Sequence, residues 1–181
     1  MDGAILLWIQ EYIRNPMLTP IMKVITALGD AGIFWILVAI LCLCIKKTRK
    51  AGATIVLALL FSLIVNNGIL KNAVARIRPY EVVDGLQCLV GRAVDFSFPS
   101  GHSGSSFAAA TVIAYLFPKK YGVPAVILAA LIAFSRLYVG IHYPTDVLVG
   151  ILDGILLGGL AVWWNPFRAE KLSANHLNPY E

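Results

Sequence analysis

Five apolar runs, separated by short polar or basic segments, dominate the sequence. They cover residues 32–45, 51–70, 103–117, 123–137 and 147–164. Hydrophobic residues make up 59% of the chain and charged residues only 14%, which is more apolar surface than a soluble domain of this size can bury. The sequence therefore predicts an all-α, polytopic bundle of membrane-spanning helices. The net charge of +5 comes without a basic stripe interleaved with aromatic residues, so we expect no nucleic-acid partner.

Residues 4–28 do not fit the pattern of the five runs. An Arg-Asn-Pro sequence at 14–16 divides them, so each piece is shorter than the about 20 residues that a ~30 Å hydrocarbon core requires. We expect these pieces to be helices that lie at the membrane interface or pack against the bundle. A sixth span is the alternative, which gives about five or six transmembrane helices. Residues 1–168 are predicted to form one membrane-embedded domain, and residues 169–181 a polar C-terminal tail.

Basic residues cluster beside three of the runs. The clusters are Lys46, Lys47, Arg49 and Lys50 after the first run, Lys119 and Lys120 after the third, and Arg168 and Lys171 after the fifth. With five spans, all three clusters fall on one side of the membrane, and the positive-inside rule makes that side cytoplasmic. The segments 78–100 and 138–143 then face the extracytoplasmic side of a cell membrane.

A basic segment from Lys71 to Pro79 follows the second run. Lys71 and Arg78 are seven residues apart, which places them on one face if the segment is helical, and Pro79 disfavours helix at Arg78. A membrane edge with snorkelling cations is the alternative. Cations at an outer edge oppose the positive-inside rule, however, so we favour a functional role. Arg76 and Arg92 are expected either to attract an anionic substrate or to be solvated loop charges.

Small residues open the third run, in the sequence Pro99-Ser100-Gly101-His102. Such a stretch at a helix start presents free backbone N–H groups and the positive end of the helix dipole to an anion. The alternative is an ordinary Ser/Gly helix cap beside an incidental histidine.

Polar residues also flank the link between the last two runs, at Ser135-Arg136 and from His142 to Asp146. His142 and Asp146 are four residues apart. The carboxylate can therefore hold one imidazole nitrogen, fix the tautomer and leave the other nitrogen free to attack. A buried ion pair that only stabilises the helix start is the alternative. Asp153, deeper in the last run, is expected to be a helix-packing partner, with a functional role as its alternative.

The three segments together supply cations, two histidines, a carboxylate and a helix N-terminus. Phosphoryl transfer needs an anion clamp, a nucleophile and an acid for the leaving oxygen. The outer face has no cluster of carboxylates that could hold two metal ions, so we expect catalysis without metal or other cofactor.

The segments resemble the tripartite signature of the type-2 phosphatidic acid phosphatase superfamily. That signature is Lys, six residues and Arg-Pro; then Pro-Ser-Gly-His; then Ser-Arg, five residues, His, three residues and Asp. Every position is matched, and the resemblance covers about residues 51–160. It implies that His142 is a nucleophile forming a phosphohistidine, that Asp146 orients it and that His102 is the general acid. The implied phosphate-binding residues are Lys71, Arg78, Ser100, Gly101 and Arg136.

The resemblance implies a hydrolase that acts on a lipid phosphate or pyrophosphate. The chain is similar to the bacterial undecaprenyl pyrophosphate phosphatases, and a phosphatidylglycerophosphate or phosphatidic acid phosphatase is the alternative. A haloperoxidase-like enzyme is disfavoured because those relatives are soluble. A non-catalytic lipid-binding or transport protein is a remoter alternative, because binding alone needs no nucleophile. The sequence does not indicate an oligomeric state.

Overall fold

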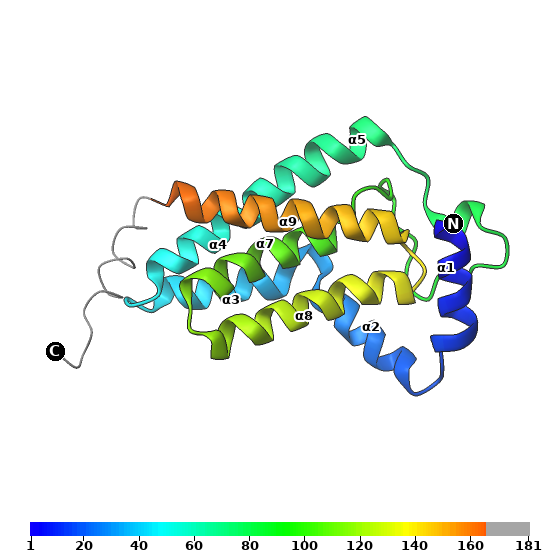
Figure 1. The fold of residues 1–181 in the computed structure, drawn as a ribbon, viewed down its shortest axis with the longest axis horizontal. Coiled ribbons are helices and arrows are strands. Elements are labelled where there is room, and N and C mark those ends of the chain that lie inside the picture. Colours follow the sequence, from blue (N-terminus) through cyan, green and yellow to red (C-terminus); the bar gives the residue numbers. More distant parts are fainter. Residues whose placement is uncertain (166–181) are drawn as a thin grey trace.

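The computed structural model describes residues 1–165, in which every regular element is a helix (Figure 1). The N-terminal part consists of α1 (Asp2–Trp8), the π-helical η1 (Ile9–Ile13), α2 (Leu18–Leu28) and the 3-10 turn η2 (Asp30–Gly32). The bundle is built from α3 (Ile33–Cys44), α4 (Arg49–Ser62), α7 (Gly101–Leu116), α8 (Lys119–Tyr138) and α9 (Pro144–Trp164). Between α4 and α7 lie η3 (Leu63–Leu70), α5 (Lys71–Val74) and α6 (Pro79–Val82). The predicted all-α class is confirmed, and the predicted tail at 169–181 lies outside the described residues.

A helix occupies each of the five predicted apolar runs. Three segments in the described part of the chain are long and apolar enough to cross a membrane: Arg49–Val82, Lys119–Tyr138 and Pro144–Trp164. The pair Leu18–Leu28 and Asp30–Cys44, bent by 49°, would add a fourth if it forms one broken span. With 16 residues, α7 is shorter than these segments.

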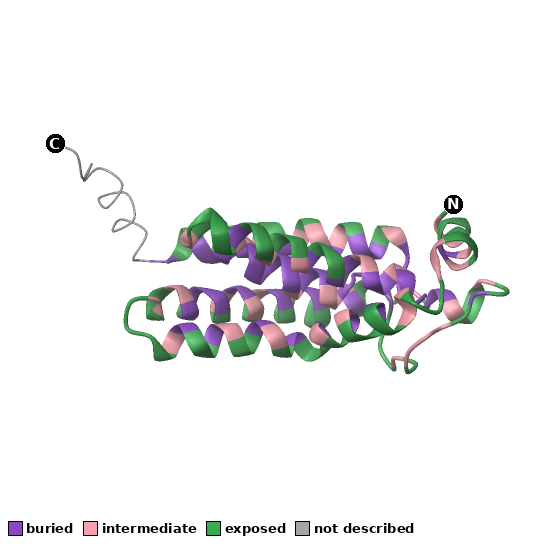
Figure 2. Ribbon diagram, turned by 90° about the horizontal axis from the view of Figure 1, so that it is seen from below, coloured by how far each residue is buried: buried purple, intermediate pink, exposed green. Residues whose placement is uncertain are grey.

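The outward faces of the bundle are apolar, as in a membrane protein. Leu156 on α9 is 70% exposed and Leu41 on α3 is 61% exposed. Figure 2 shows exposed residues along the outer sides of the helices and buried residues where the helices face one another. In water such a surface would be unfavourable by about 25 cal/mol per Å² of exposed apolar area, whereas lipid chains solvate it.

The helix α7 lies at the centre of the bundle, in contact with α4, α8 and α9. Its side chains from Ala108 to Ala110 are fully buried. On α9, three glycines spaced four residues apart face α7: a Cβ atom at Gly150, Gly154 or Gly158 would lie 2.5–2.6 Å from a carbonyl oxygen of α7 or its cap. This small-residue seam lets the two backbones approach closely, as in packed membrane helices. Asp153, on the same helix, lies near the Asn66 side chain of η3, and its Oδ2 atom is buried without a hydrogen-bond partner.

The helix α1 lies crosswise at the end of the bundle, away from the C-terminal end of α9 (Figure 1). It buries Leu6, and η1 buries Ile9, whereas Trp8 and Tyr12 remain exposed. The N-terminal helices therefore pack against the bundle, which is one of the two arrangements expected from the sequence.

The predicted common helix face of Lys71 and Arg78 is wrong. The helix ends at Val74, because Ala75 adopts a left-handed conformation with φ 48°. Arg78 is extended and precedes the short helix α6, whose first residue is Pro79, so the expected effect of the proline on Arg78 is confirmed. The two cations meet through the loop that follows, not through a shared helix.

Candidate functional site

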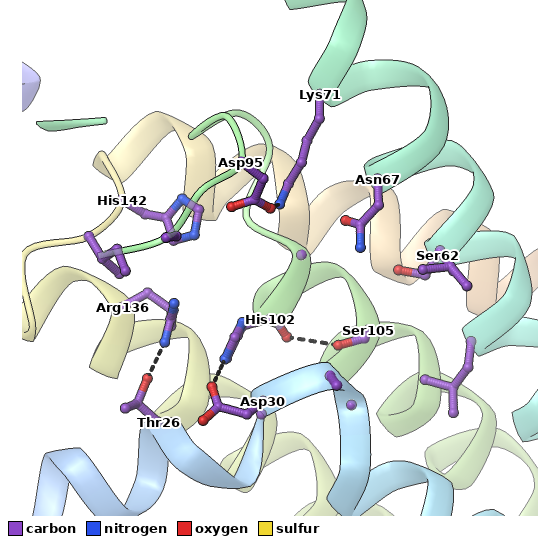
Figure 3. A pocket seen from close by; sticks show the side chains of 18 of the residues that line it. Thr26, Asp30, Ser62, Asn67, Lys71, Asp95, His102, Ser105, Arg136 and His142 are labelled. Carbon is purple, nitrogen blue, oxygen red and sulfur yellow. Dashed lines mark hydrogen bonds and ion pairs between the residues drawn. The ribbon is translucent and has the colours of Figure 1, made fainter. Parts of the chain in front are cut away.

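A cavity of about 860 Å³ opens at the end of the bundle where the three signature segments meet. Six of the eight predicted site residues line it: Lys71, Arg78, Gly101, His102, Arg136 and His142. They come from α5, the residue before α6, the start of α7, the end of α8 and the α8–α9 link (Figure 3). The other two, Ser100 and Asp146, are fully buried behind the wall of the cavity.

The cavity continues as an apolar groove between α3 and α4. Its walls there are formed by Ile36 and Ile40 of α3 and by Val56 and Leu60 of α4. These side chains are also exposed on the outer surface of the bundle, at 36–49%. The polar end of the cavity is thus joined to a hydrophobic channel that opens toward the membrane.

The cations of the first segment converge on Asp95, which the sequence analysis did not single out. Its carboxylate forms an ion pair with Lys71, and its Oδ1 atom lies 2.5 Å from Nη2 of Arg78. Arg78 also donates to the backbone oxygen atoms of Asp95 and Phe96, at 2.9 and 3.3 Å. Although burial alone would raise the pKa of Asp95, Lys71 and Arg78 lower it to about 2.

His142 is buried between Arg78 and Asp146. Its Nε2 atom lies 3.3 Å from Nη1 of Arg78, and its Nδ1 atom lies 3.6 Å from Oδ2 of Asp146. Burial lowers the pKa of His142 far below its usual range; Asp146 opposes this change, and the nearby Arg136 and Arg78 reinforce it. His142 is therefore neutral at physiological pH, and a proton on Nδ1 facing Asp146 would leave the lone pair of Nε2 on the side of the ring that faces Arg78.

Three groups hold the carboxylate of Asp146 besides His142. Ser97 Oγ and the backbone N–H of Tyr143 donate to Oδ2, at 2.5 and 3.0 Å. Arg76 donates to Oδ1 at 2.6 Å and also binds Asp2 of α1, at 2.9 Å. Asp146 thus caps the start of α9, and Arg76 is neither a solvated loop charge nor part of the cavity wall.

The backbone of Asp146 is held as well, because Ser100 N–H donates to its carbonyl oxygen at 3.0 Å. The Ser100 side chain caps α7, because its Oγ atom accepts from the Ser103 backbone N–H at 3.4 Å. The capping role expected as an alternative for Ser100 is confirmed. The backbone of Gly101 lies on the cavity wall.

The two remaining signature side chains of the cavity, those of His102 and Arg136, are held by residues of α2 and η2. His102 Nε2 lies 2.9 Å from Oδ1 of Asp30, and Arg136 donates from Nη1 to Oγ1 of Thr26 at 2.5 Å (Figure 3). The sequence analysis missed Asp30 and Thr26. A signal was present, because Gly29 to Gly32 interrupts two apolar segments with an aspartate between glycines.

No group of three or more His, Cys, Asp or Glu side chains that could hold a metal ion occurs within residues 1–165. The anion-binding character of the cavity comes from Lys71, Arg78 and Arg136 together with the N-terminus of α7. These groups suit a phosphate, whose oxygen atoms accept charge-assisted hydrogen bonds from lysine, arginine and backbone N–H donors.

Comparison with known proteins finds one matching family and several similar sequences and structures. The model of the PAP2 superfamily matches residues 51–170. An undecaprenyl-diphosphatase of Sulfolobus acidocaldarius is 34% identical over 128 residues, which cover 71% of this chain but only 62% of that protein. The undecaprenyl-diphosphatase BcrC of Bacillus subtilis is 35% identical, over 81% of this chain and 75% of the relative. The crystal structure of a PAP2-type phosphatidylglycerolphosphate phosphatase from Bacillus subtilis superposes with a TM-score of 0.73 at 28% identity, covering 99% and 87% of the two chains.

Proposed function

Because the chain belongs to the PAP2 superfamily, we propose that it is a metal-independent membrane phosphatase that hydrolyses a lipid phosphate or pyrophosphate through a phosphohistidine intermediate. The observation that carries this proposal is the cavity itself. Two histidines and three cations surround its polar end, and the apolar groove between α3 and α4 leads from there toward the membrane. A head group and a hydrocarbon chain of one substrate fit these two parts.

In the proposed first step, Nε2 of His142 attacks phosphorus while the bond to the leaving oxygen breaks. Lys71, Arg78 and Arg136 neutralise the charge on the phosphoryl oxygens, and His102 gives a proton to the leaving oxygen. In the second step His102 takes a proton from water, the water oxygen attacks phosphorus, and the bond to His142 breaks. Asp146 keeps the attacking imidazole in one tautomer throughout.

The proposed substrate is undecaprenyl pyrophosphate, a single long hydrocarbon chain on a diphosphate. Two of the relatives above are named undecaprenyl-diphosphatases, and the groove offers one apolar channel. A phosphatidylglycerophosphate phosphatase is the second candidate, supported by the superposed Bacillus subtilis structure. The test compares the rates of phosphate release from detergent-solubilised undecaprenyl pyrophosphate and phosphatidylglycerophosphate. Faster release from phosphatidylglycerophosphate would reverse our choice of substrate.

The decisive variant for the mechanism is His142→Ala. We expect a loss of at least ~10³-fold in phosphate release, because no covalent intermediate can form. Acid-labile phosphoprotein should be trapped on the native enzyme and be missing in the variant. His176→Ala, in the predicted tail, is the matched control. Near-native activity of His142→Ala would refute the proposed catalyst.

We also propose five spans with the site on the extracytoplasmic side, on the strength of the basic clusters described above. Val94 lies in the loop beside the cavity and is fully exposed, so a cysteine placed there is a suitable probe in a background without the native cysteines. A membrane-impermeant thiol reagent should label Val94→Cys in intact cells and leave Lys47→Cys unlabelled. The reverse pattern would invert the topology.

A further inference from the structure

The turn between α2 and α3 is shaped around the ring of His102. Gly29 lies against that ring, since a Cβ atom there would be 2.5 Å from Cδ2 of His102 and 2.8 Å from Cγ2 of Ile132. The chain bends by 49° between the two helices, and Ala31 and Gly32 there are left-handed, with φ 50° and 68°. A left-handed alanine is unfavourable by about 1–2 kcal/mol, and such strain persists where the surrounding structure demands it. The strained turn places the Asp30 carboxylate on the imidazole.

The contact between Asp30 and His102 defines the roles of the two ring nitrogens. Oδ1 of Asp30 lies 2.9 Å from Nε2, which leaves Nδ1 for proton exchange with a bound substrate (Figure 3). The Asp30 side chain is 62% exposed and that of His102 is 17% exposed, and both residues line the cavity. The pair is therefore open to the cavity, unlike the enclosed pair of His142 and Asp146.

The charges around His102 show why an anion is needed there. Burial lowers the pKa of His102, Arg136 of α8 and Lys71 of α5 lower it further, and Asp30 opposes them, with a net value of about 4. A general acid must carry its proton when the substrate binds. Without the carboxylate, burial and the two cations would lower this pKa further, so the imidazole would be still less able to carry the proton.

We propose that Asp30 is a positioning residue that holds Nε2 of His102 and stabilises its imidazolium form, so that Nδ1 delivers a proton to the leaving oxygen. This inference rests on the proposed phosphatase function and adds a carboxylate from outside the three signature segments. The Nδ1 proton moves to the leaving oxygen in the first step, and Nδ1 regains a proton from the attacking water in the second. Asp30 stays ionised and bound to the Nε2 proton in both.

The test is Asp30→Asn, which keeps the shape and an acceptor oxygen but removes the charge. We expect phosphate release from phosphatidic acid, whose alkoxide is a poor leaving group, to fall ~10–100-fold. Hydrolysis of p-nitrophenyl phosphate, whose leaving group hardly needs a proton, should fall far less. The basic limb of the pH–rate profile on phosphatidic acid should move to lower pH, because the imidazolium has lost its counter-ion. Asp84→Asn, an exposed loop aspartate, is the matched control.

Equal losses on both substrates with an unmoved basic limb would overturn the proposal and leave Asp30 a structural role. Unchanged activity on phosphatidic acid would overturn it as well. A second measurement does not depend on activity: the His102 ring signal, followed by NMR in protein labelled with ¹⁵N-histidine, should titrate at a lower pH in Asp30→Asn. If native protein hydrolyses neither substrate, the proposed function fails, and the titration still decides whether Asp30 stabilises the imidazolium.

Discussion

Asp95 forms ion pairs with Lys71 and Arg78, the cations that we propose bind the substrate phosphate, so replacing Asp95 should strengthen phosphate binding. Its carboxylate pairs with Lys71 on one oxygen and lies 2.5 Å from Nη2 of Arg78 on the other. An incoming phosphate must compete with this carboxylate for the same donors. Asp95→Asn removes the competing charge, while the backbone oxygen of residue 95 remains to hold Nε of Arg78.

The size of the effect follows from the pKa of Asp95, which the two cations lower from 3.8 to about 2 despite the opposing effect of burial. At 1.36 kcal/mol per pH unit, this difference corresponds to about 2.4 kcal/mol. The side chain is 47% exposed, so solvent screening reduces the figure to about 1 kcal/mol. The depressed pKa also keeps Asp95 ionised from pH 5 to 8, and the interaction is lost only as the pH falls toward 2.

The assay is competitive inhibition of p-nitrophenyl phosphate hydrolysis by inorganic phosphate and by orthovanadate. About 1 kcal/mol corresponds to an inhibition constant about fivefold lower in Asp95→Asn than in native protein. Asp84→Asn should leave both constants unchanged. An unchanged or higher constant in Asp95→Asn would refute the competition and show that Asp95 instead holds Lys71 and Arg78 in place for the substrate.

Replacing Arg76 by Gln leaves the carboxylate of Asp146 free to stabilise protonated His142, so the acid limb of the kcat/KM profile should move to higher pH. Arg76→Lys, which keeps the positive charge, should leave this limb in place. The pH–rate profiles of the native protein and the two variants test this prediction. Gly154→Ala forces a Cβ atom within 2.5 Å of an α7 carbonyl oxygen and should destabilise the fold by about 1–3 kcal/mol, measured by thermal unfolding in detergent. Gly159→Ala, where nothing lies within 4 Å, should be neutral or stabilising. Phosphate release should survive EDTA, because lysine and arginine meet the phosphate charge; a loss restored by Mg²⁺ or Zn²⁺ would contradict the mechanism.

The helices and the signature residues could be predicted because each depends on local sequence. Apolar runs identify the helices, and Pro144 begins α9 as the first-turn preference of proline indicates. The three signature segments were expected to share one end of the bundle, and His102, Arg136 and His142 do line one cavity there. The count of spans stays a prediction, since length and composition support three segments, or four with the bent pair.

The partners of those residues could not be predicted, because they depend on tertiary structure. Asp30 and His102 are 72 residues apart in sequence and meet through the bend between α2 and α3, and Asp2 and Arg76 meet across 74 residues. The helical reasoning for Lys71 and Arg78 failed for a related cause. The helix ends before Ala75, which is left-handed, and Arg78 then contacts the loop that contains Asp95. The seven-residue spacing predicted that Lys71 and Arg78 lie close together on one helix, whereas in the structure they are brought together by their shared contact with Asp95.

The two histidines of the site need different carboxylates because their proposed tasks differ. Asp146 is fully buried and bound by Arg76, Ser97 and the backbone, so its charge is neutralised and its position is fixed. A nucleophile gains from such an arrangement, because it must stay neutral and in one tautomer until it attacks. An acid must instead gain and lose a proton in every cycle. The exposed carboxylate of Asp30, with no cation hydrogen-bonded to it among the described residues, leaves its full charge available to the imidazolium of His102. The difference in burial between the two carboxylates therefore supports the proposed assignment of attack to His142 and of proton transfer to His102.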